Sequence, residues 1–107
     1  MPVENVVELD LTRPMALRII KGLAESSENI FVGKHAEKRM RERKITRTQV
    51  MRCLQKGHIT EGPARSIKGN WEFKMEVFSA GEPVAVVAAL DHDENGNYIV
   101  VITVYNS

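Results

Sequence analysis

The sequence predicts an α+β domain in which helices come first and a run of antiparallel strands follows. Apolar residues recur at helical spacing as far as Leu54, whereas from Trp71 onward they alternate with charged residues or form continuous runs. The change of period falls at Gly57. Helices followed by consecutive strands with short connections are typical of the α+β class.

Length and composition predict a single domain over residues 1–107. The chain is 43% apolar and 27% charged, which is ordinary for one folded domain and too apolar for a disordered chain. Residues 1–10 lack the basic start of a secretory signal, and no stretch approaches the ~20 apolar residues of a membrane helix. We therefore expect no contact with a membrane. Cys53 is the single cysteine, which is typical of a cytoplasmic protein, and we expect its thiol to be buried.

The N-terminal part of the chain predicts one helix with a short extended segment before it. Apolar and acidic residues alternate over residues 7–11, which weakly indicates a strand. Thr12 is a suitable N-cap for a helix from about Arg13 to Glu25. The apolar stripe of this helix is formed by Ala16, Ile19, Ile20 and Leu23. After it, residues 30–32 form a brief apolar segment.

A short basic helix over residues 34–43 is the most distinctive feature of the sequence. Its only apolar residues are Ala36 and Met40, which form a narrow stripe. Three polar side chains lie together on the flank of this stripe at 100° per residue, namely His35, Arg39 and Glu42. Residues 34–52 carry eight basic and two acidic groups in a chain of net charge +1, so a polyanion would meet one positive face.

A second short helix is predicted over residues 47–56. Thr46 and Gln49, three positions apart, have the spacing of a capping box. Gly57 is predicted to end the helix in the left-handed conformation. The two short helices are therefore joined by a very tight turn, which also suggests a DNA-reading helix-turn-helix, although the turn lacks the usual glycine and an ordinary helical hairpin is favoured.

The C-terminal half is predicted to form the sheet. Residues 58–61 indicate a short strand that Gly62 and Pro63 would end. Residues 71–77 alternate between apolar and charged, as expected of a strand with one buried and one solvated face. The nearly continuous apolar runs 83–90 and 98–105 are typical of central strands covered on both sides.

Residues 91–97, between the last two strands, match part of a calcium-binding loop. The matching residues are Asp91, Asp93, Asn95 and Gly96. The bidentate glutamate that such a loop requires is replaced by Ile102, so a solvated hairpin turn is favoured. The three histidines are too dispersed for a zinc site, and no phosphate-binding loop or nucleophile elbow is present, so neither a metal nor a cofactor is predicted.

Residues 35–45 have the pattern His-Ala-x-x-Arg-Met-x-x-Arg-x-Ile, which resembles the opening block of the bacterial domain-of-unknown-function family number 4258. Gly57, Glu61 and the valine-rich end at residues 101–105 extend the similarity over about residues 34–105. The resemblance implies a toxin-like protein, remotely similar to the RelE and colicin ribonuclease fold. Two or three helices would then pack on a four-stranded antiparallel sheet, and RNA would be cleaved without a metal.

Such a reaction requires proton transfer and cations that stabilise charge on the phosphate. His35 suits proton transfer because the pKa of an imidazole lies near neutrality. Arg39, one helical turn on, would bind the phosphate with its fork of donors. The candidate catalytic residues are His35, Arg39, Thr103 and Tyr105, and the candidate phosphate-binding residues are Arg43 and Lys74.

Two functions from different classes follow from these residues. The first is an RNA-binding protein or metal-independent ribonuclease that meets RNA or the ribosome through the basic helix. The second is a non-catalytic module of a toxin–antitoxin-type pair that binds an antitoxin-like protein, with His35 and Arg39 pinning their helix in place. The clustered basic residues and the His–Arg pair favour the first function, and the nearly neutral overall charge favours the second.

Overall fold

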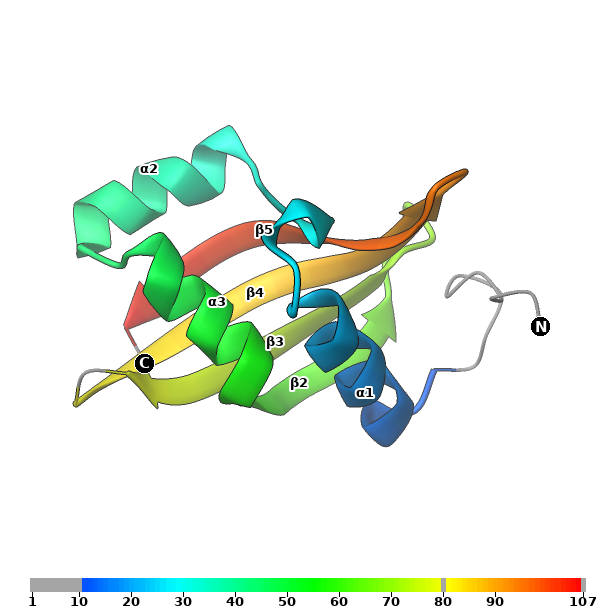
Figure 1. Ribbon diagram of the computed structural model, residues 1–107, viewed down its shortest axis with the longest axis horizontal. Coiled ribbons are helices and arrows are strands. Elements are labelled where there is room, and N and C mark those ends of the chain that lie inside the picture. Colours follow the sequence, from blue (N-terminus) through cyan, green and yellow to red (C-terminus); the bar gives the residue numbers. More distant parts are fainter. Residues whose placement is uncertain (1–10, 80, 107) are drawn as a thin grey trace.

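The computed structural model describes residues 11–79 and 81–106, and within these residues three α-helices pack on a five-stranded sheet (Figure 1). In chain order the elements are α1 (Arg13–Leu23), the short 3-10 helix η2 (Ser27–Asn29), β1 (Ile30–Val32), α2 (Lys34–Arg43), α3 (Arg47–Lys56), β2 (His58–Arg65), β3 (Trp71–Ser79), β4 (Glu82–Asp93) and β5 (Gly96–Asn106). The α+β class is thereby confirmed. The strand suggested over residues 7–11 lies outside the described residues except for Leu11, which is not in a strand.

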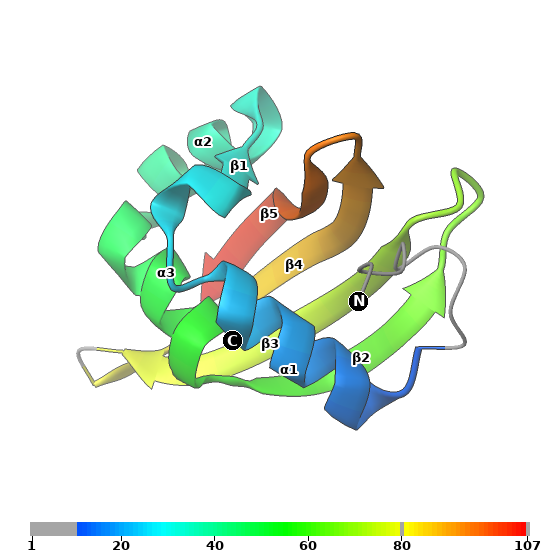
Figure 2. The same cartoon turned by 45° about the vertical axis from the view of Figure 1, so that its right-hand side comes forward.

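The sheet has the strand order β1-β5-β4-β3-β2 and is mixed rather than antiparallel. Strands β2 to β5 pair antiparallel, as predicted, but β1 adds a fifth strand parallel to β5, pairing Ile30–Val32 with Ile99–Val101. The prediction of four strands missed β1 because three residues are too few to show a period. Figures 1 and 2 show α1 and α3 on the same face of the sheet, and we call the opposite face the helix-free face.

One hydrophobic core lies between the helices and the sheet. Ile20 of α1, Leu54 of α3 and Met75 of β3 are fully buried in it. Ala85 and Ala89 of β4 are also buried, although they lie outside this core cluster. The apolar run of β4 is thus buried on both faces, as expected, with small residues on the face opposite the helices. In β5, by contrast, Val100 is half-buried and Ile102 is exposed, so the same expectation was wrong for residues 98–105.

Helices α1 and α3 begin at the caps that the sequence predicted. The Thr12 hydroxyl accepts a hydrogen bond from the Met15 amide at 3.3 Å, and α1 then ends at Leu23, two residues before the predicted end. The capping box of Thr46 and Gln49 is present in both directions. Cap chemistry therefore located both helix starts, as expected for a local interaction.

Gly57 does not adopt the predicted left-handed conformation. Its φ of −78° and ψ of −175° are extended, because the chain passes directly from α3 into β2. A Cβ at this position would lie 2.6 Å from the Cys53 carbonyl oxygen and 2.8 Å from that of Glu76. Glycine is therefore needed here for the close approach of two backbones rather than for its φ.

Gly57→Ala is expected to destabilise the fold by about 2 kcal/mol, because the added methyl meets backbone carbonyls that cannot move aside. The matched control is Gly22→Ala in α1, where a Cβ would have no neighbour within 4 Å and should raise stability by about 0.5–1 kcal/mol. Urea unfolding of both variants measures the difference. Equal stabilities would refute this explanation of Gly57.

Strand β2 continues through Gly62 and Pro63, where the sequence predicted that it would end. The ladder with β3 has register shifts between Ile59 and Glu61 and again between Glu61 and Ala64. Because β2 is an edge strand, a proline can be accommodated there without the loss of a central ladder hydrogen bond. The irregularity therefore bends the strand instead of ending it.

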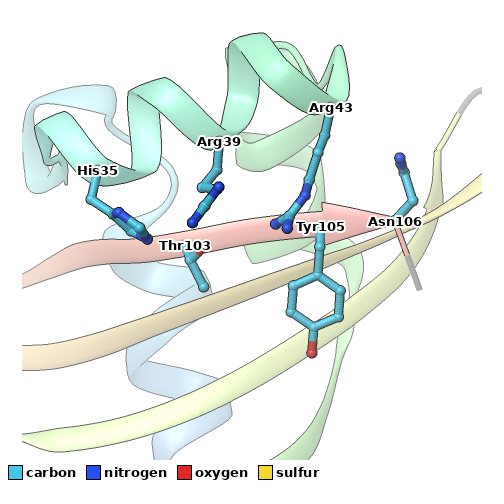
Figure 3. A pocket seen from close by; sticks show the side chains of 6 residues that line it. All are labelled: His35, Arg39, Arg43, Thr103, Tyr105 and Asn106. Carbon is cyan, nitrogen blue, oxygen red and sulfur yellow. The ribbon is translucent and has the colours of Figure 1, made fainter.

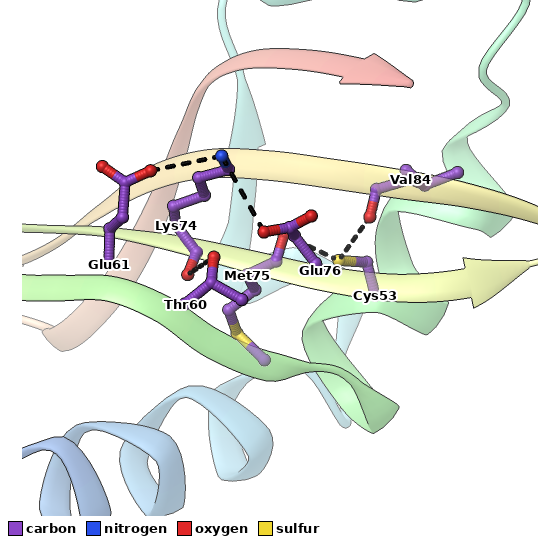
Figure 4. Close-up of polar contacts among 7 residues, drawn as sticks. All are labelled: Cys53, Thr60, Glu61, Lys74, Met75, Glu76 and Val84. Carbon is purple, nitrogen blue, oxygen red and sulfur yellow. Dashed lines mark hydrogen bonds and ion pairs between the residues drawn. The ribbon is translucent and has the colours of Figure 1, made fainter. Parts of the chain in front are cut away.

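Two smaller predictions concern the β4–β5 connection and Cys53. The connection is a tight hairpin in which the Asp93 carboxylate accepts a hydrogen bond from the Asn95 amide at 2.8 Å, as a solvated turn requires. Cys53 is buried, and its thiol lies 3.4 Å from the Met75 carbonyl oxygen (Figure 4). Burial raises the pKa of this thiol to about 12.

None of the helices in the described part of the chain is long and apolar enough to cross a membrane.

Candidate nucleic-acid interface between α2 and β5

Helix α2 lies along the part of β5 that β1 leaves uncovered. Strand β1 pairs only with residues 99–101, and α2 follows it over the C-terminal half of β5 (Figure 1). Ala36 is buried and Met40 is half-buried, so the narrow apolar stripe faces the body of the protein as predicted. Arg43 donates a hydrogen bond from Nη1 to the Val104 carbonyl oxygen at 2.7 Å, which ties the end of α2 to β5.

The tight turn between α2 and α3 depends on Lys44. This residue is left-handed, with φ 55° and ψ 42°, and the Ile45 amide then donates to the Met40 carbonyl oxygen at 2.9 Å. Ile45 is buried. The left-handed helix end is therefore at Lys44, a non-glycine residue whose conformation the sequence did not indicate.

A bulge in β5 decides which side chains face the helix-free side. The β4–β5 register shifts between Val87 and Ala88, so that Ile102 is an extra residue between Val101 and Thr103. Val101 is buried in the core, and Thr103 and Tyr105 therefore point to the opposite face of the strand. Figure 3 shows both side chains extending from β5 on the same side.

These elements form an open hollow of about 590 Å³ between α2 and β5. Its lining residues are His35, Arg39, Arg43, Thr103, Tyr105 and Asn106 (Figure 3). Five of the six predicted site residues thus meet in one place, and the sixth, Lys74, is not among them. Asn106 was missed because an amide at the end of a strand carries no sequence signal of its own.

The three basic side chains of the hollow differ in their contacts. Arg39 forms an ion pair with Glu42 at 2.7 Å, one turn along α2, and Arg43 bonds to β5. His35 is exposed and makes no hydrogen bond or ion pair within residues 11–79 and 81–106. A guanidinium has five N–H donors, so both arginines keep donors for an anion. The hollow is therefore basic and accessible.

The ion pair between Arg39 and Glu42 lowers the pKa of the Glu42 carboxyl. Its hydrogen bond to Arg39 is the main reason why the pKa of the Glu42 carboxyl lies below its ordinary 4.5. Because this pKa is lowered, the pairing is complete at neutral pH and is lost as the pH falls through the pKa of the folded state.

Arg39→Ala should return the pKa of Glu42 toward 4.5, which a carbon-detected NMR titration of the glutamate side chains measures. Arg41→Ala on the same helix is the control, since Arg41 is not among the charges that lower the pKa of Glu42 and its removal should leave this pKa nearly unchanged. An unchanged Glu42 titration in Arg39→Ala would contradict the ion pair.

Lys74 lies on the helix-free face beside Tyr105. Its Nζ is 5.0 Å from the centre of the Tyr105 ring. It also lies 3.2 Å and 3.8 Å from carboxylate oxygens of Glu61 and Glu76 (Figure 4). The Tyr105 hydroxyl and then the Glu61 carboxylate raise the pKa of Lys74 above its usual range. Two carboxylates thus balance this ammonium, which distinguishes it from the arginines of the hollow.

Comparison with known proteins identifies a family. The model of a family described as "Domain of unknown function (DUF4258)" matches residues 32–106, which include α2, β5 and every residue of the hollow. The comparisons with curated proteins and with solved structures found no match. The family resemblance of residues 35–45 is thereby confirmed, and the chain belongs to the domain-of-unknown-function family DUF4258.

Proposed function

We propose that this protein is a toxin-like RNA-binding protein that cleaves RNA without a metal ion in the hollow between α2 and β5. The observation that carries the proposal is the meeting of His35, Arg39 and Arg43 from one helix with Thr103 and Tyr105 from one strand. A base, an acid and cations around one phosphate are what metal-independent phosphodiester cleavage needs.

The reaction assigns each of these side chains a role. His35 takes the proton of a ribose 2′-hydroxyl while that oxygen attacks the phosphorus, and the bond from phosphorus to the 5′-oxygen breaks. Tyr105 gives its proton to the leaving oxygen, and exchange with water restores both side chains. The products are a 2′,3′-cyclic phosphate and a 5′-hydroxyl, so that all atoms and protons are accounted for.

The arrangement of the side chains supports this division of roles. His35 and Tyr105 lie toward opposite ends of the group, with Arg39 between them (Figure 3). An in-line displacement needs its base and its acid on opposite sides of the phosphorus. Arg39 and Arg43 would stabilise the charge that develops on the phosphate, and the Thr103 hydroxyl would donate to a non-bridging oxygen.

The position of Lys74 supports a role other than the predicted binding of a phosphate. It is balanced by Glu61 and Glu76 and lies outside the hollow, so a phosphate gains little from it. Its ammonium lies beside the Tyr105 ring. Within this proposal Lys74 therefore positions Tyr105 instead of binding the phosphate.

The RelE-like fold and the toxin-like class are part of the same proposal. Four antiparallel strands, β2 to β5, with helices on one face support it, and the parallel strand β1 is a departure from the four-stranded pattern. The basic helix α2 is the surface that would meet RNA or the ribosome.

One observation favours a second candidate, a non-catalytic module that binds an antitoxin-like protein. Arg39 and Arg43 both have partners within the protein, as expected of side chains that hold α2 in place. His35 has no such partner in the described structure, which favours the ribonuclease.

The test is cleavage of total RNA by purified protein in EDTA, beside His35→Ala and Arg39→Ala variants shown to be folded by circular dichroism. The ribonuclease predicts cleavage that is lost only in the variants. If the wild type and both variants are equally inert, with and without ribosomes, the module is favoured and a protein partner should be sought.

A further inference from the structure

A pair of aromatic rings lies at the surface where β1 meets β5. Phe31 is 54% exposed although it belongs to a strand. The centre of its ring is 5.4 Å from that of Tyr98, with the two ring planes at 84°. We call these two side chains the aromatic platform, and they border a depression of about 280 Å³. More than half of Phe31 is therefore open to a ligand.

The aromatic platform lies on the same face of the sheet as the hollow. Ile30 of β1 and Ile99 of β5 are buried in the core. Since side chains alternate along a strand, Phe31 and Tyr98 point to the helix-free face. Thr103, which lines the hollow, points to this face as well. One extended ligand on the helix-free side of β5 can therefore contact both places.

The platform lies at the His35 end of the hollow. Figure 2 shows β1 and then α2 beside β5, and His35 follows Phe31 by four residues. Phe31 pairs with Val100, and two ladder steps, about 7 Å, separate Val100 from Thr103, because the bulge adds a residue without adding a step. Nucleotides in a stacked strand are about 3.4 Å apart, so about one or two nucleotides span this gap.

The charge of the depression excludes a phosphate and admits an uncharged group. Its described lining includes two carboxylates, those of Glu28 and Asp93, and no lysine or arginine. The rings and the amides of Asn29 and Asn97 suit a flat group with a polar edge. Proteins that bind single-stranded RNA hold its bases on aromatic side chains of this kind, beside a basic surface that binds the phosphates.

We infer that the aromatic platform stacks a base of the RNA substrate, from a nucleotide on the 5′ side of the cleaved bond. The inference rests on the proposed function for its substrate class and its polarity. His35 takes the proton of the attacking 2′-hydroxyl, which belongs to the nucleotide before the cleaved bond. Tyr105, the proton donor to the nucleotide after that bond, lies toward the opposite end of the hollow (Figure 3). Every base has a π face, so the platform positions the strand without fixing its sequence.

The test that does not depend on cleavage is the affinity for a short RNA oligonucleotide with 2′-O-methyl sugars, which has no 2′-hydroxyl to attack, measured by fluorescence anisotropy. Phe31→Leu should bind it at least about fivefold more weakly than the wild type, the low end of the loss of one base–aromatic stack, and Phe31→Trp should retain the affinity. The matched control is Phe78→Leu, because Phe78 is 76% exposed and borders a different depression. Its affinity should stay within about twofold of the wild type.

A version of this oligonucleotide without bases separates stacking from a disturbance of the fold. It should bind the wild type and Phe31→Leu equally. Equal binding of the complete oligonucleotide by these two proteins would overturn the inference and leave the rings to a protein partner. No binding by the wild type would overturn it too, as would an equal loss of affinity with and without bases.

Cleavage assays test the polarity and separate the inference from the proposed function. Single-turnover cleavage should slow when the two nucleotides before the cleaved bond lack bases and change little when the two after it do, and Phe31→Leu should erase this difference. The reverse order would overturn the polarity. Cleavage in EDTA without any effect of Phe31→Leu on binding rejects the platform and leaves the ribonuclease standing, whereas base-dependent binding by a protein that cuts no RNA supports the platform and rejects the ribonuclease.

Discussion

His35→Ala is expected to slow RNA cleavage by about 10²–10⁴-fold, the usual contribution of a general base. The proton of the 2′-hydroxyl would lose its acceptor, because the hollow contains no second imidazole or carboxylate among its lining residues. The fold should not change, since His35 is exposed and forms no hydrogen bond or ion pair within the described residues. Single-turnover cleavage of a defined RNA at pH 7 measures the loss.

His58→Ala is the matched control for this variant. His58 is also exposed, but it begins β2 and borders a different depression, beside Thr60 and Phe78. Its removal should leave the cleavage rate within about twofold of the wild type, since it is outside the proposed machinery. A comparable loss in both variants, or in neither, would contradict the role assigned to His35.

Arg39→Ala is expected to lower kcat/KM by about 10²–10³-fold, as the removal of one donor to a developing oxyanion does. Arg39 lies in the middle of the hollow, and its loss also leaves the Glu42 carboxylate unbalanced at the rim, where it repels a phosphate. RNA binding should weaken as well. Its dependence on salt concentration should also decrease, because about one counterion fewer is released on binding.

Arg41→Ala removes the same charge from the same helix without touching the hollow. It should change the salt dependence slightly and kcat little, because a remote charge steers RNA but does not stabilise the reacting phosphate. If the two variants lose activity equally, the positive charge of α2 acts as a whole and the hollow is not a site. Arg39→Lys, which keeps the charge but not the fork of donors, should recover only part of the activity.

The sequence predicted the helices best, because their signals are local. Helices α2 and α3 begin and end at the predicted residues, and Thr12 and Thr46 are the N-caps, as predicted. Strand β1 and the parallel pairing with β5 were missed, since they depend on contact between residues about 70 positions apart. Gly57 is extended where the left-handed conformation was expected, and Lys44 is left-handed without a sequence signal, for a similar reason: the conformation of each is decided by where the chain must go next.

Most of the candidate site could be predicted from two periods. Helical spacing places His35, Arg39 and Arg43 on one face of α2, and strand alternation places Thr103 and Tyr105 on one face of β5. That this strand face meets the helix depends on the bulge at Ile102, and that Lys74 lies outside the hollow depends on the order of the strands. Neither bulges nor strand order leave a periodic trace in a single sequence.

The most direct test of the central claim compares one RNA oligonucleotide with the same oligonucleotide carrying 2′-deoxy sugars, both incubated with the protein in EDTA. The proposed reaction uses the 2′-oxygen as its nucleophile, so the RNA should be cut to ends with 2′,3′-cyclic phosphate and 5′-hydroxyl groups, and the deoxy version should stay intact. Cleavage of both oligonucleotides, or of neither even when ribosomes are added, would contradict the account.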